Sequence, residues 1–134
     1  MPLDVLIARW VAVMWLICGL SHAFYPAKWS ALLVPLKDRE TGGFILAAMS
    51  LPFGLVIILG HNIWGWDFPV IVTVAGWLTT FKSVAYLLFP RAHMRVMYSS
   101  EHMVGGSMEK AFRFVGVIMF VLGLIAAYDS FFQR

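Results

Sequence analysis

Four long apolar stretches set the strongest limit on how this chain can fold. They cover Val5–Tyr25, Gly43–Gly60, Phe68–Phe89 and Ala111–Tyr128. A helix needs about 20 mainly apolar residues to cross the roughly 30 Å of hydrocarbon in a bilayer, and each stretch approaches that length. Residues 55–59 are continuously apolar, whereas the strands of a membrane barrel alternate. The sequence therefore predicts an all-α membrane protein with a bundle of four transmembrane helices.

The composition of the chain agrees with a membrane location. Of the 134 residues, 61% are hydrophobic and 13% are charged, and the mean hydropathy is +0.83, outside the usual range of a soluble globular domain. The net charge of +3 does not indicate nucleic-acid binding, because the basic residues border the apolar stretches. The single cysteine, Cys18, excludes an intrachain disulfide and a cysteine-based metal cage. We expect one membrane domain over residues 1–134.

The basic residues concentrate in the two longer connections between the apolar stretches. They are Lys28, Lys37 and Arg39 in the first connection, and Arg91, Arg95, Lys110 and Arg113 in the second. The opposite side offers only Arg9 and Arg134. Loops that stay in the cytoplasm carry such an excess of lysine and arginine. The bias predicts that both long loops are cytoplasmic and that both termini lie on the other side of the membrane.

The two halves of the sequence share features at similar spacing. The matching steps are Tyr25-Pro26 with Phe89-Pro90, Gly42-Gly43 with Gly105-Gly106, and Gly54-Leu55 with Gly123-Leu124. This pattern predicts a tandem duplication of a helical hairpin, with repeat 1 over 1–65 and repeat 2 over 66–134. Two spans per repeat preserve the orientation, so a pseudo-two-fold axis would lie along the membrane normal. The alternative is chance, because proline and glycine are common at helix ends.

The connections also contain residues suited to the membrane surface. Trp29, Leu32, Leu33 and Leu36 recur at helical spacing and predict a short helix in the headgroup zone, and His93, Met94, Met97 and Tyr98 give a weaker pattern in the second loop. On the other side, an interfacial turn carries His61, Asn62, Trp64 and Trp66. The amphipathic tryptophan rings suit an interface.

Lys82 is the residue in the apolar stretches that most needs an explanation. It lies eight positions before Pro90, about 12 Å of helix rise from that end. A charge at this depth must snorkel to the surface, find a partner or face a polar cavity, and no Asp or Glu lies in the middle of any stretch. Thr79, Ser83 and Tyr86 share its side of the helix and would line a polar pathway with it. Snorkelling and a polar cavity both stay open.

Small residues recur at helical spacing in the third and fourth stretches. They are Thr73, Gly76, Thr80 and Ser83 in the third, and Gly116, Gly123 and Ala127 in the fourth. In lipid such stripes let helix backbones approach closely. We interpret Thr73, Gly76, Thr80, Gly116 and Gly123 as helix-packing positions.

Metal, cofactor and catalytic sites are not predicted. His22, His93 and His102 belong to the loop side with several methionines, but no His-x₃-His or paired-carboxylate spacing accompanies them. His61 lies at the opposite membrane surface from His22, which argues against a haem between them. The sequence contains no nucleophile elbow, P-loop, HExxH or dinucleotide fingerprint.

The region centred on the third stretch resembles a known pattern. The residues His61-Asn62-Ile63-Trp64, followed by Pro69, Thr73, Gly76-Trp77, Lys82 and Pro90, are similar to those of small four-helix bacterial inner-membrane proteins without an assigned function. The resemblance implies a bacterial inner-membrane location, for which the lysine and arginine bias described above would place both termini in the periplasm. It also marks the turn and Lys82 as positions of functional interest, and it implies no catalytic residue.

Three functional hypotheses remain at this stage. The first is a channel-like or transporter-like homo-oligomer in which Lys82 favours an anion or a small polar solute. The second is a non-catalytic accessory subunit that docks its small-residue stripes on a larger membrane complex. The third is a redox protein that binds haem or a quinone, supported only by the aromatic residues and scattered histidines. The lipid bilayer is the common partner in all three.

Overall fold

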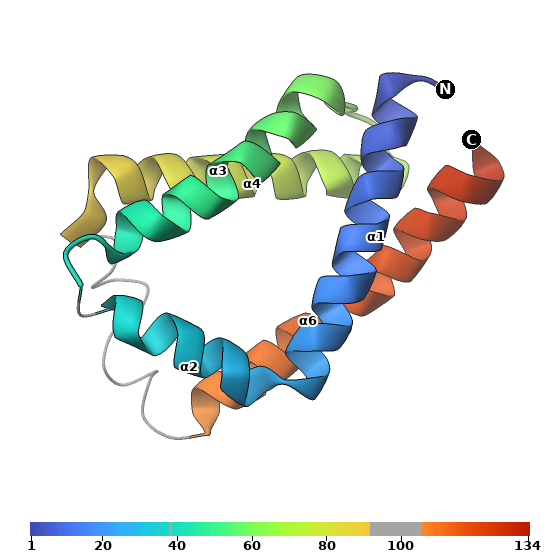
Figure 1. Cartoon of the computed structure of the whole chain (residues 1–134). Helices are drawn as coiled ribbons and strands as arrows, with labels where there is room; N and C mark the ends of the chain where they lie inside the picture. The colour runs from blue at the N-terminus through green and yellow to red at the C-terminus, as the bar shows by residue number, and fades with distance from the viewer. Residues whose placement is uncertain (38, 92–105) are drawn as a thin grey trace.

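The computed structural model describes residues 1–37, 39–91 and 106–134. Its helices are α1 (Leu3–Phe24), α2 (Pro26–Lys37), α3 (Gly42–Gly60), α4 (Pro69–Leu88) and α6 (Ser107–Tyr128), and a π-helical turn η2 (Asp129–Gln133) continues α6. The described residues contain no strand (Figure 1). The positions expected to form a second surface segment, His93, Met94, Met97 and Tyr98, lie outside the described residues.

The predicted all-α membrane fold is confirmed. Four helices are long and apolar enough to cross a membrane, namely α1, α3, α4 and the combined α6 and η2. The chain is therefore a multi-pass membrane protein. The short helix expected in the first loop is present as α2, which begins at Pro26, where the fixed φ of proline suits a first helical turn.

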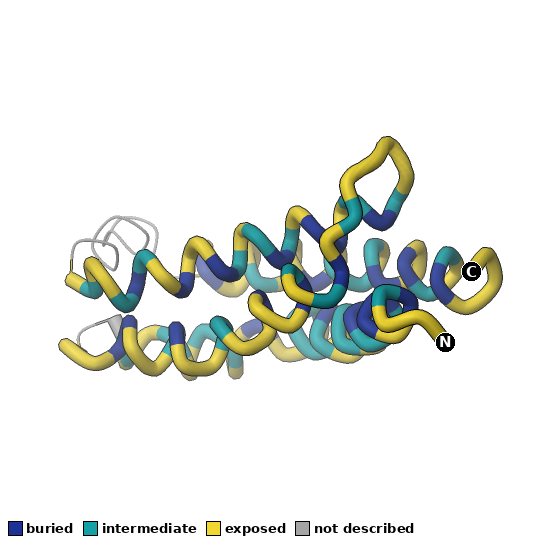
Figure 2. Tube along the Cα trace, turned by 90° about the horizontal axis from the view of Figure 1, so that it is seen from above, coloured by how far each residue is buried: buried dark blue, intermediate teal, exposed yellow. Residues whose placement is uncertain are grey.

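The four long helices form two close pairs. α1 packs along α6, and α3 packs along α4, whereas contacts between the two pairs are sparse. Figure 1 shows the pairs converging at the end that holds both termini and diverging toward α2. Buried positions recur along each helix and alternate with exposed ones (Figure 2). Each pair therefore has its own packed seam.

Glycines bring the backbones of α1 and α6 into direct contact. A Cβ atom on Gly19 would lie 2.6 Å from the backbone nitrogen of Phe120 and 2.8 Å from the carbonyl oxygen of Gly116. A Cβ on Gly123 would lie 2.9 Å from the backbone nitrogen of Leu16. Backbone atoms have no rotamer by which to move away, so this seam requires glycine.

The α3–α4 seam is built in the same way. A Cβ on Gly54 would lie 2.8 Å from the backbone nitrogen of Thr80. Further along the pair, Ala47 is fully buried in a cluster with Tyr86, which is 1% exposed. Small residues on one helix thus accommodate the backbone or a large side chain of the other.

The two seams repeat one another in register. Leu16 and Thr80 each lie ten residues before a proline that follows the helix, and each faces the glycine of a Gly-Leu step, Gly123 or Gly54. The helix ends match as well, because Tyr25 N donates to Ser21 O at 2.9 Å and Phe89 N donates to Ala85 O at 2.8 Å. α1 therefore corresponds to α4, and α6 to α3.

A third match lies where the pairs converge. Arg9 Nε donates to Ser130 O at 2.9 Å, and at the matching place Thr73 Oγ1 donates to His61 O at 3.1 Å. A two-fold rotation that carries α1 onto α4 and α3 onto α6 also exchanges the two pairs. Each close pair joins a helix of 1–65 with a helix of 66–134, an arrangement that such a rotation permits. The tandem duplication itself stays a prediction, which these recurring contacts support.

The glycine seam gives a direct stability prediction. We expect Gly19→Ala to destabilise the chain by about 1–3 kcal/mol, because overpacking against backbone atoms outweighs the better helix propensity of alanine, which is worth less than about 1 kcal/mol. Gly65→Ala is the control, since no atom lies within 4 Å of a Cβ at Gly65. Thermal unfolding in detergent, followed by circular dichroism, measures both. Equal unfolding midpoints for Gly19→Ala and Gly65→Ala would contradict the close backbone contact between α1 and α6.

Candidate functional site

Lys82 lies on the exposed surface of α4, within the part of the chain that is long and apolar enough to span a membrane. It is six residues from the end of the helix at Leu88, about 9 Å of helix rise. Among the described residues, no carboxylate forms an ion pair with it and no side chain accepts a hydrogen bond from it. Its ammonium group is therefore not neutralised within the described chain.

Thr79 lines a crevice between the two helix pairs. The crevice has a volume of about 170 Å³. Its lining residues are Trp10, Val11, Met14, Trp15, Cys18, Phe53, Ile57, Ala75, Thr79 and Met119. Trp10 stacks on Phe53 with ring centroids 5.5 Å apart and so joins α1 to α3 at this point. Lys82 follows Thr79 by three residues and shares its side of α4, one turn closer to the end where the pairs diverge.

Ser83 and Tyr86, which we expected to line a pathway with Lys82, lie instead in the α3–α4 seam. Ser83 is fully buried, and its Oγ is 2.7 Å from Ser50 Oγ on α3 and 2.8 Å from Thr79 O. Tyr86 is 1% exposed. The four residues thus divide into an exposed or crevice-lining pair, Lys82 and Thr79, and a buried pair that holds α3 against α4.

Thr73 connects the turn between α3 and α4 to the first turns of α4. Its Oγ1 accepts a hydrogen bond from Ile63 N at 3.0 Å and lies within donating distance of His61 O and of Ile63 O, at 3.1 and 3.0 Å. The other predicted packing residues, Gly76, Thr80, Gly116 and Gly123, lie in the seams without such a polar role for the turn. Thr73 therefore acts through its hydroxyl rather than through its small size.

The turn between α3 and α4 presents tryptophan side chains on its exposed surface. Asn62 Oδ1 accepts hydrogen bonds from Trp64 Nε1 at 2.9 Å and from Trp77 Nε1 at 3.2 Å. Trp64 and Trp66 are themselves exposed. The amide of Asn62 thus holds one exposed tryptophan of the turn against a tryptophan of α4.

His61 is fully buried beneath this turn. Its Nδ1 lies 3.3 Å from Thr73 Oγ1, and its Nε2 has no hydrogen-bond partner among the described residues. Burial lowers the pKa of His61 below the usual value for histidine, so the imidazole is neutral near pH 7. The surrounding charges are those of Arg134, Asp4 and Asp129.

The same end of the molecule is tied together by ionic contacts that the sequence pattern did not indicate. Arg134 pairs with Asp4 at 3.8 Å and with Asp129 at 3.3 Å. Arg9, which we considered only as a topological charge, donates to Ser130 O and lies over the Phe131 ring, 4.6 Å from its centroid. The contacts with Asp129, Ser130 and Phe131 depend on the π-helical turn η2, for which the sequence carries no recognisable signal.

The described residues contain no group of three His, Cys, Asp or Glu side chains that could hold a metal ion. His22 stacks on Trp29, with ring centroids 4.0 Å apart, and its Nδ1 lies 2.6 Å from Cys18 O. The histidines His93 and His102 lie outside the described residues.

Comparison with protein-family models, with curated proteins and with solved structures finds no match to this chain.

The burial of His61 predicts a pH-dependent stability. Because its pKa is lowered in the folded chain, the unfolded chain binds a proton at a higher pH than the folded one does. Stability is therefore retained above pH 7 and falls as the pH drops through the usual histidine range near 6.5, by at most about 1.4 kcal/mol per pH unit for one proton.

Thermal unfolding of the whole chain in detergent at pH 7.5 and pH 5.5 measures this effect. We expect His61→Asn to reduce the loss of stability between pH 7.5 and pH 5.5, because the amide does not titrate. We expect His22→Gln to leave that loss of stability unchanged. The same acid sensitivity in His61→Asn as in the wild type would exclude His61 as its source.

Proposed function

We propose that the chain acts as a homo-oligomer in a bacterial inner membrane and provides a pathway for an anion or a small polar solute. The observation that carries this proposal is the exposed position of Lys82 on α4, without a partner among the described residues.

The cost of a charge in hydrocarbon supports a polar environment for Lys82. A lysine at the centre of a spanning helix costs about 2.5–3.5 kcal/mol, less where its side chain snorkels. A pathway that admits water and an anion removes this cost and gives the ammonium group a counter-charge. Thr79, one turn away, supplies a hydroxyl along the same side of α4.

The proposal needs more than one copy of the chain. The crevice beside Thr79 holds about 170 Å³ and its lining is largely apolar, so it offers little room for a continuous polar route. Between 17% and 33% of the residues in each spanning window are buried within the chain. A second copy covering the Lys82 side of α4 would enclose a route between subunits.

We further propose that the end carrying α2 faces the cytoplasm and that both termini are periplasmic. The exposed basic residues Lys28, Arg39, Arg91, Lys110 and Arg113 lie at or near the ends of helices on the α2 side. The bias of lysine and arginine toward the cytoplasm supports this orientation.

Flux measurements in proteoliposomes test the role of Lys82. We expect Lys82→Met to lower chloride or nitrate flux roughly tenfold, the factor that corresponds to 1.4 kcal/mol of anion stabilisation, and Lys82→Arg to preserve most of it. Lys110→Met is the control, because Lys110 is an exposed lysine at the start of α6. Equal flux for Lys82→Met and the wild type across the tested anions would contradict the mechanism.

An accessory role is the second candidate, because the uncovered surfaces of the spans would also suit a larger complex. Purification in mild detergent separates the two. We expect a homo-oligomer that contains no other polypeptide and keeps its size on dilution. Stoichiometric copurification of one other membrane protein would favour the accessory role and count against the homo-oligomer.

A further inference from the structure

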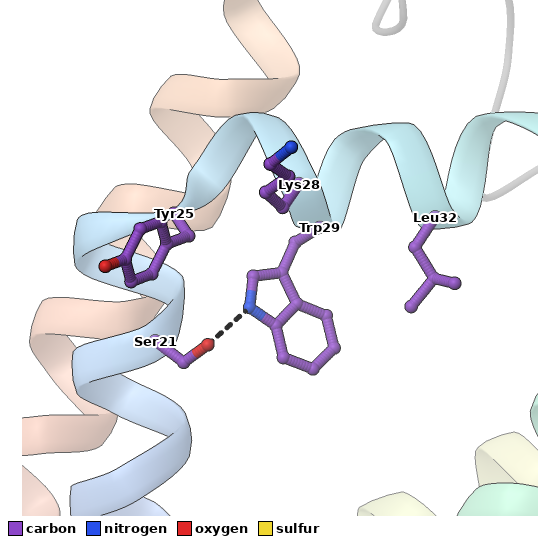
Figure 3. Close-up of a pocket in the computed structure, with 5 residues that line it drawn as sticks. All are labelled: Ser21, Tyr25, Lys28, Trp29 and Leu32. Carbon is purple, nitrogen blue, oxygen red and sulfur yellow. Dashed lines mark hydrogen bonds between the residues drawn. The ribbon is translucent and has the colours of Figure 1, made fainter.

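The elbow between α1 and α2 forms a second site, separate from Lys82. α2 starts at Pro26, with only the cap residue Tyr25 between it and the end of α1, and the sharp change of direction leaves an open pocket of about 370 Å³. Its lining residues are Ser21, Tyr25, Lys28, Trp29 and Leu32 (Figure 3). These five come from the last turn and cap of α1 and from the first two turns of α2.

Trp29 is held in place across the elbow. Its Nε1 donates to Ser21 Oγ at 3.0 Å, and its ring stacks on His22 with the planes 14° apart. Figure 3 shows the indole turned back toward α1, with Lys28 and Tyr25 further out on the elbow. The indole thus forms a fixed wall of the pocket rather than a mobile surface group.

Each polar side chain that lines this elbow can donate a hydrogen bond or carries a positive charge. Ser21 Oγ uses its oxygen to accept from Trp29, which leaves its proton for another acceptor. Lys28 is exposed and forms no ion pair with any described carboxylate. Tyr25 adds a phenol, which can also donate. No carboxylate lines the pocket, so the group complementary to it is an anion.

The other half of the chain lacks these polar groups at the matching positions of the sequence. α4 ends with the same backbone cap as α1, yet Ala85 and Phe89 stand where α1 has Ser21 and Tyr25. By the same register, the sequence has Ala92 and His93 in place of Lys28 and Trp29. The hydroxyls, the ammonium and the indole are therefore found in the first half of the chain and not at the matching positions of the second half.

We propose that the α1–α2 elbow binds the phosphate headgroup of an acidic phospholipid. Lys28 pairs with the phosphate, Ser21 and Tyr25 donate hydrogen bonds to its oxygens, and the faces of Trp29 and Leu32 contact the glycerol and the first part of an acyl chain. The occupant is a lipid rather than a free anion, because the pocket lies at the end of a membrane-spanning helix. Leu20 and Phe24, both exposed, continue its apolar surface along that helix.

Native mass spectrometry of the whole chain, purified with a mixture of phosphatidylglycerol and phosphatidylcholine, tests this site. The wild type is expected to retain phosphatidylglycerol preferentially. Lys28→Gln is expected to lower that retention about fivefold, the effect of one lysine at an acidic membrane surface, and Lys28→Arg to restore it. Lys110→Gln is the matched control, an exposed lysine outside the pocket.

Three results would overturn the proposal. They are no preference for phosphatidylglycerol in the wild type, an equal loss in Lys28→Gln and Lys110→Gln, or release of the lipid by millimolar inorganic phosphate, which would indicate a site for free anions. Circular dichroism of each variant verifies that the helices are intact. Trp29→Phe is a second variant, which keeps the charge of Lys28. We expect it to retain less phosphatidylglycerol, because the hydrogen bond to Ser21 is lost. Unchanged retention would count against the proposed pocket.

Discussion

The structure depends on backbone contact between helices at glycine. In a bilayer the lipid tails are as apolar as the side chains they touch, so burying leucine against leucine gains little over leaving it in lipid. Close approach and interhelical polar contacts must supply the attraction instead. Gly19 and Gly54 allow that approach in the two seams, and the Ser50–Ser83 contact adds a polar link where α3 meets α4. The large apolar side chains are thereby left to face outward.

The polar residues of the spans have different roles inside and outside the seams. Those that lie in a seam or beneath the turn, such as Ser83, Thr73 and His61, hold helices together and are closed to solvent. Other polar residues lie outside the seams and keep hydrogen-bonding capacity or charge for a partner. They are Thr79 and Lys82 on one face of α4, and Lys28 at the elbow between α1 and α2. Our proposals about function rest on this second group, because only an accessible polar group can meet a solute or a lipid.

The sequence was sufficient to predict the number of spans, their approximate ends and the helix within the first loop. Hydropathy decides these features residue by residue, with no need for tertiary information. Periodicity could place Ser83 and Tyr86 on the same side as Lys82, but it could not decide where on that side α3 packs, since neighbouring positions on a helix divide between seam and surface. Similarly, the small size of Thr73 suggested packing, whereas its hydroxyl bonds to a turn whose geometry appears only in the fold. Arg9 and Arg134 contact residues of η2, a π-helical turn that no local sequence pattern predicts.

The divergence of the two helix pairs has a consequence for how the chain holds together. The pairs meet at the end that carries the termini and separate toward α2 (Figure 1), and contacts between them are sparse. The glycine contacts at Gly19, Gly123 and Gly54 all lie within one pair or the other. Each pair is therefore held together by its own seam, independently of the angle between the pairs.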